Sequence, residues 1–118
     1  MDISILFDIV KQKGNKMNRP RKNNQLDIDA LTLAAECLKA LAHPHRLQIV
    51  QLLLSGKQLS VNEIAEHCDL NQPTTSDHLR LMQRCGFLES QRSGRTVIYS
   101  VSEPHLQDIM SCIQNRFG

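Results

Sequence analysis

Short polar side chains that can donate and accept hydrogen bonds are concentrated between residues 72 and 80 of this 118-residue chain. They follow Asn71, a favoured N-cap residue, and surround Pro73, which fits in a first helical turn. Such residues near a helix N-terminus can hydrogen-bond to base edges and phosphates in the major groove of DNA. We predict a helix over about residues 72–85. Its candidate DNA contacts are Gln72, Thr74, Thr75, Ser76, His78 and Arg80.

Two residues of this helix allow other interpretations. Thr75 shares its helical spacing with Leu79 and Met82, so that stripe can face inward. Asp77 is unusual on a surface that faces DNA. It can accept a hydrogen bond from a cytosine amino group, or it can complement the helix dipole away from the phosphates, and we favour the second role.

Two arginines mark a second region that can contact DNA. Arg92 and Arg95 flank Ser93-Gly94, which is a two-residue hairpin signal. The runs 87–92 and 95–101 have the composition of strands, and the second is rich in β-branched residues. We predict a wing at about residues 91–96, whose arginines contact phosphates or the minor groove.

The segment before residue 72 has the pattern of a first helix and a turn. Ser60 and Glu63 have the spacing of a capping box, which satisfies backbone amides at a helix start. Residues 69–71 interrupt the apolar pattern, so a helix-turn-helix follows.

Amphipathic patterns on both sides of this motif predict three more helices. One is capped by Asp27 or Asp29 and ends near Ala42, one runs from Pro44 to Gly56, and one begins at Pro104. The predicted fold is therefore mainly α with a small β-hairpin. Four helices, the hairpin and a last helix form a winged helix-turn-helix.

The charge distribution predicts one domain preceded by a basic tail. Residues 1–25 carry six basic and two acidic residues and form a flexible arm, which is either a solvated tail or a phosphate contact. Residues 26–118 form the winged helix domain, with eight basic and ten acidic residues. Because this domain is not basic as a whole, DNA affinity must come from a local positive patch.

The sequence lacks the patterns of several other protein classes. Its first ten residues are apolar but too short to span a membrane, and they lack the features of a signal peptide. We therefore expect a cytoplasmic protein with no membrane partner. No phosphate-binding loop, HExxH motif or nucleophile elbow is present, so we do not expect an enzyme.

Residues from about Glu36 to Val101 resemble the ArsR/SmtB family of small bacterial winged-helix repressors. The resemblance rests on residues 38–47, 59–65, 72–79, 86–88 and 92–99. It implies a homodimer that binds a pseudo-palindromic operator in double-stranded DNA and releases it when an effector arrives. It also implies that the first and last helices pair across the dimer axis.

The metal sites of the resembled family are absent or broken in this sequence. The family's thiolate site needs a Cys-x-Cys pair, but Ser60 and Asn62 occupy the matching positions. Glu103 and His105 match the first half of the family's zinc site on the last helix. Arg116 stands where the second histidine belongs, so we predict neither a metal nor another cofactor.

Two alternatives for the effector remain at the level of the sequence. His105, Asp108 and Cys112 share one helical face and can form a private metal site. Cys37 on the first helix and Cys112 on the last can form a thiol switch if the dimer brings them together. Cys68 and Cys85 are interpreted as packing residues, and His43 and His45 as capping or surface residues.

A different class of function also fits the scaffold. A winged helix can serve as a protein-interaction module, because fold alone does not determine function. The polar helix face and the wing arginines favour DNA, whereas the acidic balance of residues 26–118 weakly favours a protein partner.

Overall fold

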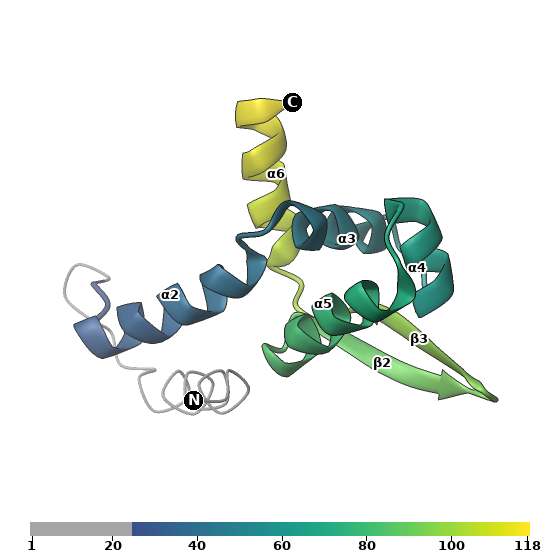
Figure 1. Cartoon of the computed structure of the whole chain (residues 1–118). Coiled ribbons are helices and arrows are strands. Elements are labelled where there is room, and N and C mark those ends of the chain that lie inside the picture. Colours follow the sequence, from purple (N-terminus) through teal and green to yellow (C-terminus); the bar gives the residue numbers. More distant parts are fainter. Residues whose placement is uncertain (1–24) are drawn as a thin grey trace.

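The computed structural model describes residues 25–118, so the predicted arm lies outside the described residues apart from its last position. The described residues are mainly helical with a small sheet, which confirms the predicted winged helix-turn-helix (Figure 1). None of the described helices has the length and hydrophobicity needed to cross a membrane. The elements in chain order are α2 (Ile28–Leu41), α3 (Pro44–Leu54), β1 (Leu59–Ser60), α4 (Val61–Cys68), α5 (Gln72–Arg84), β2 (Leu88–Ser93), β3 (Thr96–Val101) and α6 (Leu106–Phe117).

The helix-turn-helix is fixed by local hydrogen bonds that its sequence supplies. Ser60 and Glu63 form both bonds of the predicted capping box at the start of α4. Asp69 ends this helix in the left-handed conformation, with φ of 55°. The Asn71 side chain then accepts a hydrogen bond from the Thr74 amide at 2.8 Å and begins α5.

The last helix begins later than the sequence pattern predicts. Pro104 and His105 form a turn, and α6 starts at Leu106 without a side-chain cap. Pro104 therefore precedes α6 and does not occupy its first helical position, although a proline has no amide hydrogen and would be tolerated there.

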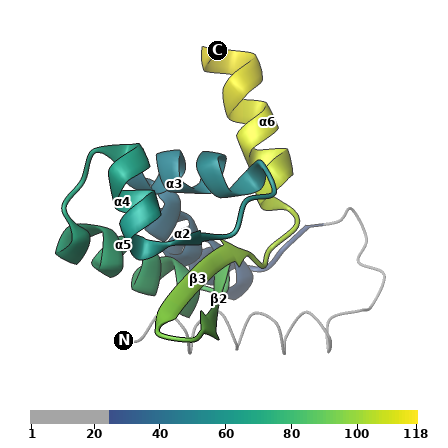
Figure 2. The ribbon, with the colours of Figure 1, turned by 90° about the vertical axis from the view of Figure 1, so that its right-hand side faces the viewer.

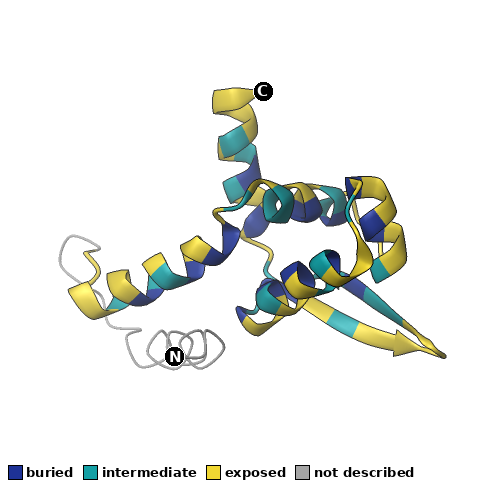
Figure 3. Cartoon of the chain, viewed as in Figure 1, coloured by how far each residue is buried: buried dark blue, intermediate teal, exposed yellow. Residues whose placement is uncertain are grey.

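The hydrophobic core lies where α3, α4 and α5 meet the sheet. Ile49, Ile64, Leu79 and Met82 have no exposed surface. Helices α2 and α6 extend away from this core, and their outer portions are largely exposed (Figures 1 and 3). Two helices that project in this way leave side chains that no other described element covers.

The wing is the β2–β3 hairpin, with a turn one residue later than predicted. Strands β2 and β3 form this hairpin (Figure 2). The three antiparallel strands have the order β1-β3-β2, and Ser93 pairs with Thr96. The two-residue loop is therefore Gly94-Arg95 and not Ser93-Gly94. Gly94 has φ of 64°, so the residue that tolerates a positive φ occupies the first central position of the turn. Arg95 is consequently at the wing tip, whereas Arg92 lies within β2.

Candidate DNA interface

Helix α5 turns one side toward the core and the other toward solvent. Leu79 and Met82 anchor the inner side, where α5 packs against α3, α4 and β2. The exposed residues of its outer side include Gln72, Asp77 and Arg80. The partly exposed Thr74 and Ser76 lie at the same end of the helix.

Thr75 and His78 lie on the inner side, so their prediction as DNA contacts is wrong. Thr75 is fully buried, and its hydroxyl donates a hydrogen bond to the Asn71 carbonyl at 2.8 Å. The inward stripe that Thr75 shares with Leu79 was the correct signal. His78 lies beside that stripe and is 8% exposed, so it cannot meet a base edge in this arrangement.

His78 belongs to a cluster of basic side chains between α3 and α5. Its Nδ1 accepts a hydrogen bond from Nε of Arg46 at 3.1 Å. Its ring centroid is 4.7 Å from that of His43 and 6.4 Å from that of His45. Burial lowers the pKa of His78, the positive charges of Arg46, His43 and His45 lower it further, and Asp77 opposes them. Neutral His78 therefore connects α5 to α3.

His43 has the capping role predicted for it. It occupies the N-cap of α3, where its Nδ1 accepts a hydrogen bond from the His45 amide at 3.1 Å. Pro44 follows as the first residue of this helix, as the sequence predicts.

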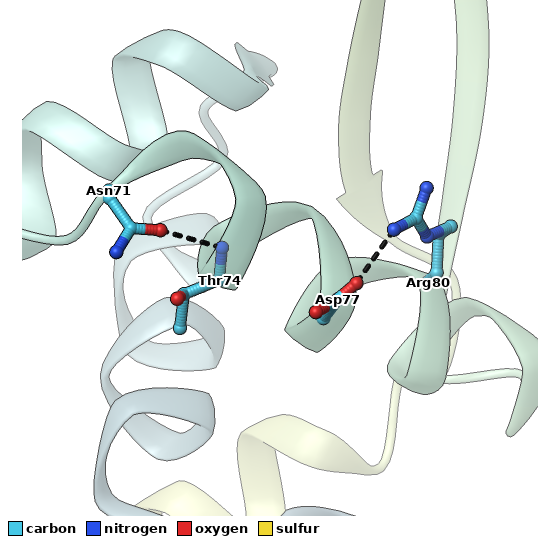
Figure 4. Close-up of polar contacts among 4 residues, drawn as sticks. All are labelled: Asn71, Thr74, Asp77 and Arg80. Atoms are coloured by element: carbon cyan, nitrogen blue, oxygen red, sulfur yellow. Dashed lines mark hydrogen bonds and ion pairs between the residues drawn. The ribbon is translucent and has the colours of Figure 1, made fainter.

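Asp77 and Arg80 form an ion pair on the outer side of α5. Oδ1 of Asp77 accepts a hydrogen bond from a terminal guanidinium nitrogen of Arg80 at 2.7 Å (Figure 4). No acidic residue lies in the first turn of α5, so the helix-dipole role predicted for Asp77 is wrong. Its observed partner is the arginine one turn later.

A groove joins the start of α5 to the wing. Its lining includes Gln72 and Arg95, which the sequence predicted as DNA contacts in separate elements. It also includes Asn62 and Thr96, which the sequence analysis did not identify as contacts. Asn62 lies in the first turn of the capped helix α4. This position near a helix N-terminus was the sequence feature that could have identified it as a possible contact. Polar groups, helix N-termini and an arginine together can bind a phosphodiester.

Several known proteins are similar to this chain in sequence. The helix-turn-helix domain model matches residues 41–91. The transcriptional repressor SmtB of Mycobacterium tuberculosis is 38% identical over 82 residues, which are 70% of this chain but only 60% of SmtB. The transcriptional repressor PagR of Bacillus anthracis is 35% identical over 91 residues, which are 77% of this chain and 91% of PagR.

A solved structure is also similar to this chain in its fold. The homodimeric winged helix-turn-helix DNA-binding domain from Mycobacterium bovis, titled a possible ArsR-family regulator, has a TM-score of 0.64 and 29% identity. The alignment covers 79% of this chain and 87% of that one. The chain belongs to the ArsR/SmtB family. The positions of the family's thiolate and metal sites can therefore be examined in this ArsR/SmtB chain.

The position of the family's thiolate site serves a structural role in this ArsR/SmtB chain. The Ser60 hydroxyl accepts a hydrogen bond from the Glu63 amide, and Glu63 accepts one from the Ser60 amide. Hydrogen bonding of the Glu63 carboxylate to the Ser60 backbone amide, and then to the Ser60 side chain, lowers the pKa of the Glu63 carboxyl. Asn62, at the second matching position, lines the groove beside the wing.

The alternative of a private metal site on the last helix is not assembled within a single chain. Among residues 25–118, no three histidine, cysteine, aspartate or glutamate side chains are grouped so that they could hold a metal ion. His105, Asp108 and Cys112 are thus not assembled. Nδ1 of His105 instead lies 2.8 Å from a carboxylate oxygen of Glu103.

The two cysteines of the predicted thiol switch have different surroundings. Cys37 is buried in α2, and burial followed by the charge of Glu36 raises the pKa of its thiol. Cys112 is exposed on α6, and no disulfide joins the four cysteines of the chain. Cys68 and Cys85 are buried, and both belong to the core as packing residues. The thiol switch stays a prediction, since it requires a partner chain.

We expect one cysteine of the native protein to be alkylated much faster than the others. Cys112 should react with iodoacetamide at least about tenfold faster than Cys37, because the exposed thiol is accessible and the buried one resists ionisation. Mass spectrometry of time-quenched samples would identify the alkylated cysteine. Cys112→Ser should remove the fast phase and Cys37→Ser should preserve it; a fast phase that survives in Cys112→Ser would contradict the prediction.

Proposed function

We propose that this chain is a transcriptional repressor that binds a specific sequence in double-stranded DNA as a homodimer. The observation that carries the proposal is the groove in which Gln72 of α5 and Arg95 of the wing face the same space. With α5 in the major groove, its outer polar residues would meet base edges, and the wing would contact the backbone or the minor groove. The DNA-facing residues would be Gln72, Thr74, Ser76, Arg80, Arg92 and Arg95.

The exposed apolar side chains support the homodimer. Large hydrophobic residues that are about half or more exposed lie at the start of α2, along it, and at the end of α6. In α2, Ile28, Leu31 and Leu38 form a stripe at helical spacing, separate from the stripe that faces the core. A second copy of the chain would cover these faces. A two-fold axis would then place two α5 helices about 34 Å apart, in successive major grooves of a pseudo-palindromic operator.

The wing tip provides the direct test of DNA binding. We expect Arg95→Ala to weaken operator binding and to reduce the dependence of log affinity on log salt by about one unit, because one phosphate contact is lost. The measurement is a fluorescence-anisotropy titration across salt concentrations, with the DNA upstream of the protein's own gene.

Arg116→Ala is the matched control for this wing variant. It removes the same charge from the end of α6, which points away from α5 and the wing (Figure 1), and sedimentation velocity should show that this variant is still a dimer. We expect its salt dependence to equal that of the wild type. Binding that is indifferent to salt and to Arg95 would overturn the DNA proposal and favour the protein-interaction module.

A further inference from the structure

The outer side of α5 has an acidic residue at its centre. Pro73, Asp77, Arg80 and Arg84 follow one another at intervals of four, three and four residues, and all four are exposed. Asp77 therefore lies on the line of the helix that points away from the core. In the proposed complex this line faces the major groove, so Asp77 would be surrounded by phosphates that repel it.

The fold does not depend on the Asp77–Arg80 pair. The side chains are 74% and 62% exposed, respectively. An exposed ion pair between residues three apart on a helix contributes little to stability, because solvent screens it. Neither side chain packs in the hydrophobic core. Asp77 is unfavourable near DNA and contributes little to folding, so a role in DNA recognition is the explanation that remains.

The pair restrains the position of the Arg80 guanidinium. An unrestrained arginine on a DNA-facing helix can reach phosphates, which carry no sequence information. The hydrogen bond that Arg80 donates to Asp77 occupies one terminal nitrogen of the guanidinium and holds the group over the helix face. The remaining N–H groups are free of Asp77 and can form the two-hydrogen-bond contact with O6 and N7 of guanine.

We infer that Asp77 is a specificity-determining residue, which directs Arg80 toward a guanine and penalises binding to DNA without that guanine. This inference rests on the proposed function. It assigns Asp77 two effects, and both reduce binding to DNA that lacks the guanine. Loss of its charge would favour any DNA, whereas loss of its hydrogen bond would release Arg80 from the guanine to the phosphates.

The test compares the operator with a scrambled duplex of equal length. For Asp77→Ala we expect affinity for the scrambled duplex to rise about tenfold, with a salt dependence steeper by about one unit, because the released Arg80 gains a phosphate. Affinity for the operator should stay the same or fall, so the ratio of the operator affinity to the scrambled-duplex affinity should drop at least about tenfold. Asp77→Asn keeps the size of the side chain and should show the charge effect without a gross change in helix packing.

A guanine scan tests the direction of Arg80. Replacing each operator guanine with 7-deazaguanine removes the N7 acceptor at one position at a time. In the wild type, one position in each half-site should cost at least about fivefold in affinity. That cost should disappear in Arg80→Ala and in Asp77→Ala. If it persists in Arg80→Ala, or if no position is sensitive, the assignment of Arg80 to a guanine is overturned.

Glu36→Gln is the matched control. Glu36 pairs with Lys39 at 3.0 Å on α2, also three residues apart, so this variant disrupts a similar pair outside the proposed DNA interface and outside the apolar stripe of α2. We expect its affinity ratio to match the wild type. An equal rise of both affinities in Asp77→Ala would overturn the inference and leave only a general charge effect. A wild type that does not distinguish the operator from the scrambled duplex would instead refute the proposed function.

Discussion

Replacing Leu38 with glutamate is expected to convert the protein to a monomer and to weaken operator binding by about 10²–10⁴-fold. Leu38 is 54% exposed at the C-terminal end of the apolar stripe of α2. In the proposed dimer this side chain would be buried twice, once from each copy, so two unpaired carboxylates would enter an apolar interface. The loss of affinity follows because two linked α5 helices bind as one unit, and the second contact is lost with the partner.

Two measurements separate this effect from misfolding. Sedimentation velocity should show a monomer, and the far-ultraviolet circular dichroism per residue should stay unchanged, because Leu38 is outside the core of the single chain. Gln51→Glu adds the same group at an exposed position of α3 and should remain a dimer with wild-type affinity. A dimeric Leu38→Glu protein that binds the operator normally would contradict the assignment of α2 to the interface.

The local signals of the sequence were sufficient to predict the helices and the hairpin of this fold, but not the two-residue strand β1 that pairs with β3. Ser60, Glu63 and Asn71 act within a few residues of their own positions, so a pattern of residue types determines what they bond to. The turn of the wing was misplaced by one residue. Strand register decides which residues occupy a two-residue loop, and a pair such as Ser93-Gly94 does not define that register.

The candidate site was harder to predict, because side-chain direction on α5 depends on tertiary packing. The polar types of Thr75 and His78 indicated a DNA-facing surface, but Thr75 bonds to its own helix and His78 to Arg46 on α3. Burial of a polar side chain is acceptable when its hydrogen bonds are satisfied. The partner of His78 is 32 positions away in the chain, so no local pattern could have identified it.

Arg46 is expected to be one of the most sensitive positions for stability. Its guanidinium donates to Nδ1 of His78 at 3.1 Å and to the carbonyl of Ala40, near the end of α2, at 3.2 Å. Arg46→Met keeps an unbranched apolar stem but removes both donors, so two partly buried acceptors lose their bonds. We expect the free energy of unfolding to fall by about 2–3 kcal/mol, measured by urea denaturation at pH 7.5.

The dependence of stability on pH distinguishes this hydrogen bond from simple packing. The pKa of His78 is lowered below its ordinary value of 6.5, so near and below that pH the unfolded chain binds more protons than the folded one. The stability contributed by neutral His78 is therefore complete above about pH 6.5 and is lost as the pH falls toward the lowered pKa. Protonated His78 also cannot accept the bond from Arg46.

Removal of Arg46 should weaken this pH dependence. Its positive charge is one cause of the lowered pKa of His78, so the pKa should rise in Arg46→Met and the acid-linked loss of stability should shrink. The difference in unfolding free energy between the two proteins should thus be smaller at pH 5 than at pH 7.5. Arg84→Met, at an exposed position near the end of α5, should change stability by less than about 0.5 kcal/mol at either pH. A difference that is independent of pH would mean that Arg46 stabilises the junction by packing alone and not through the acceptor on His78.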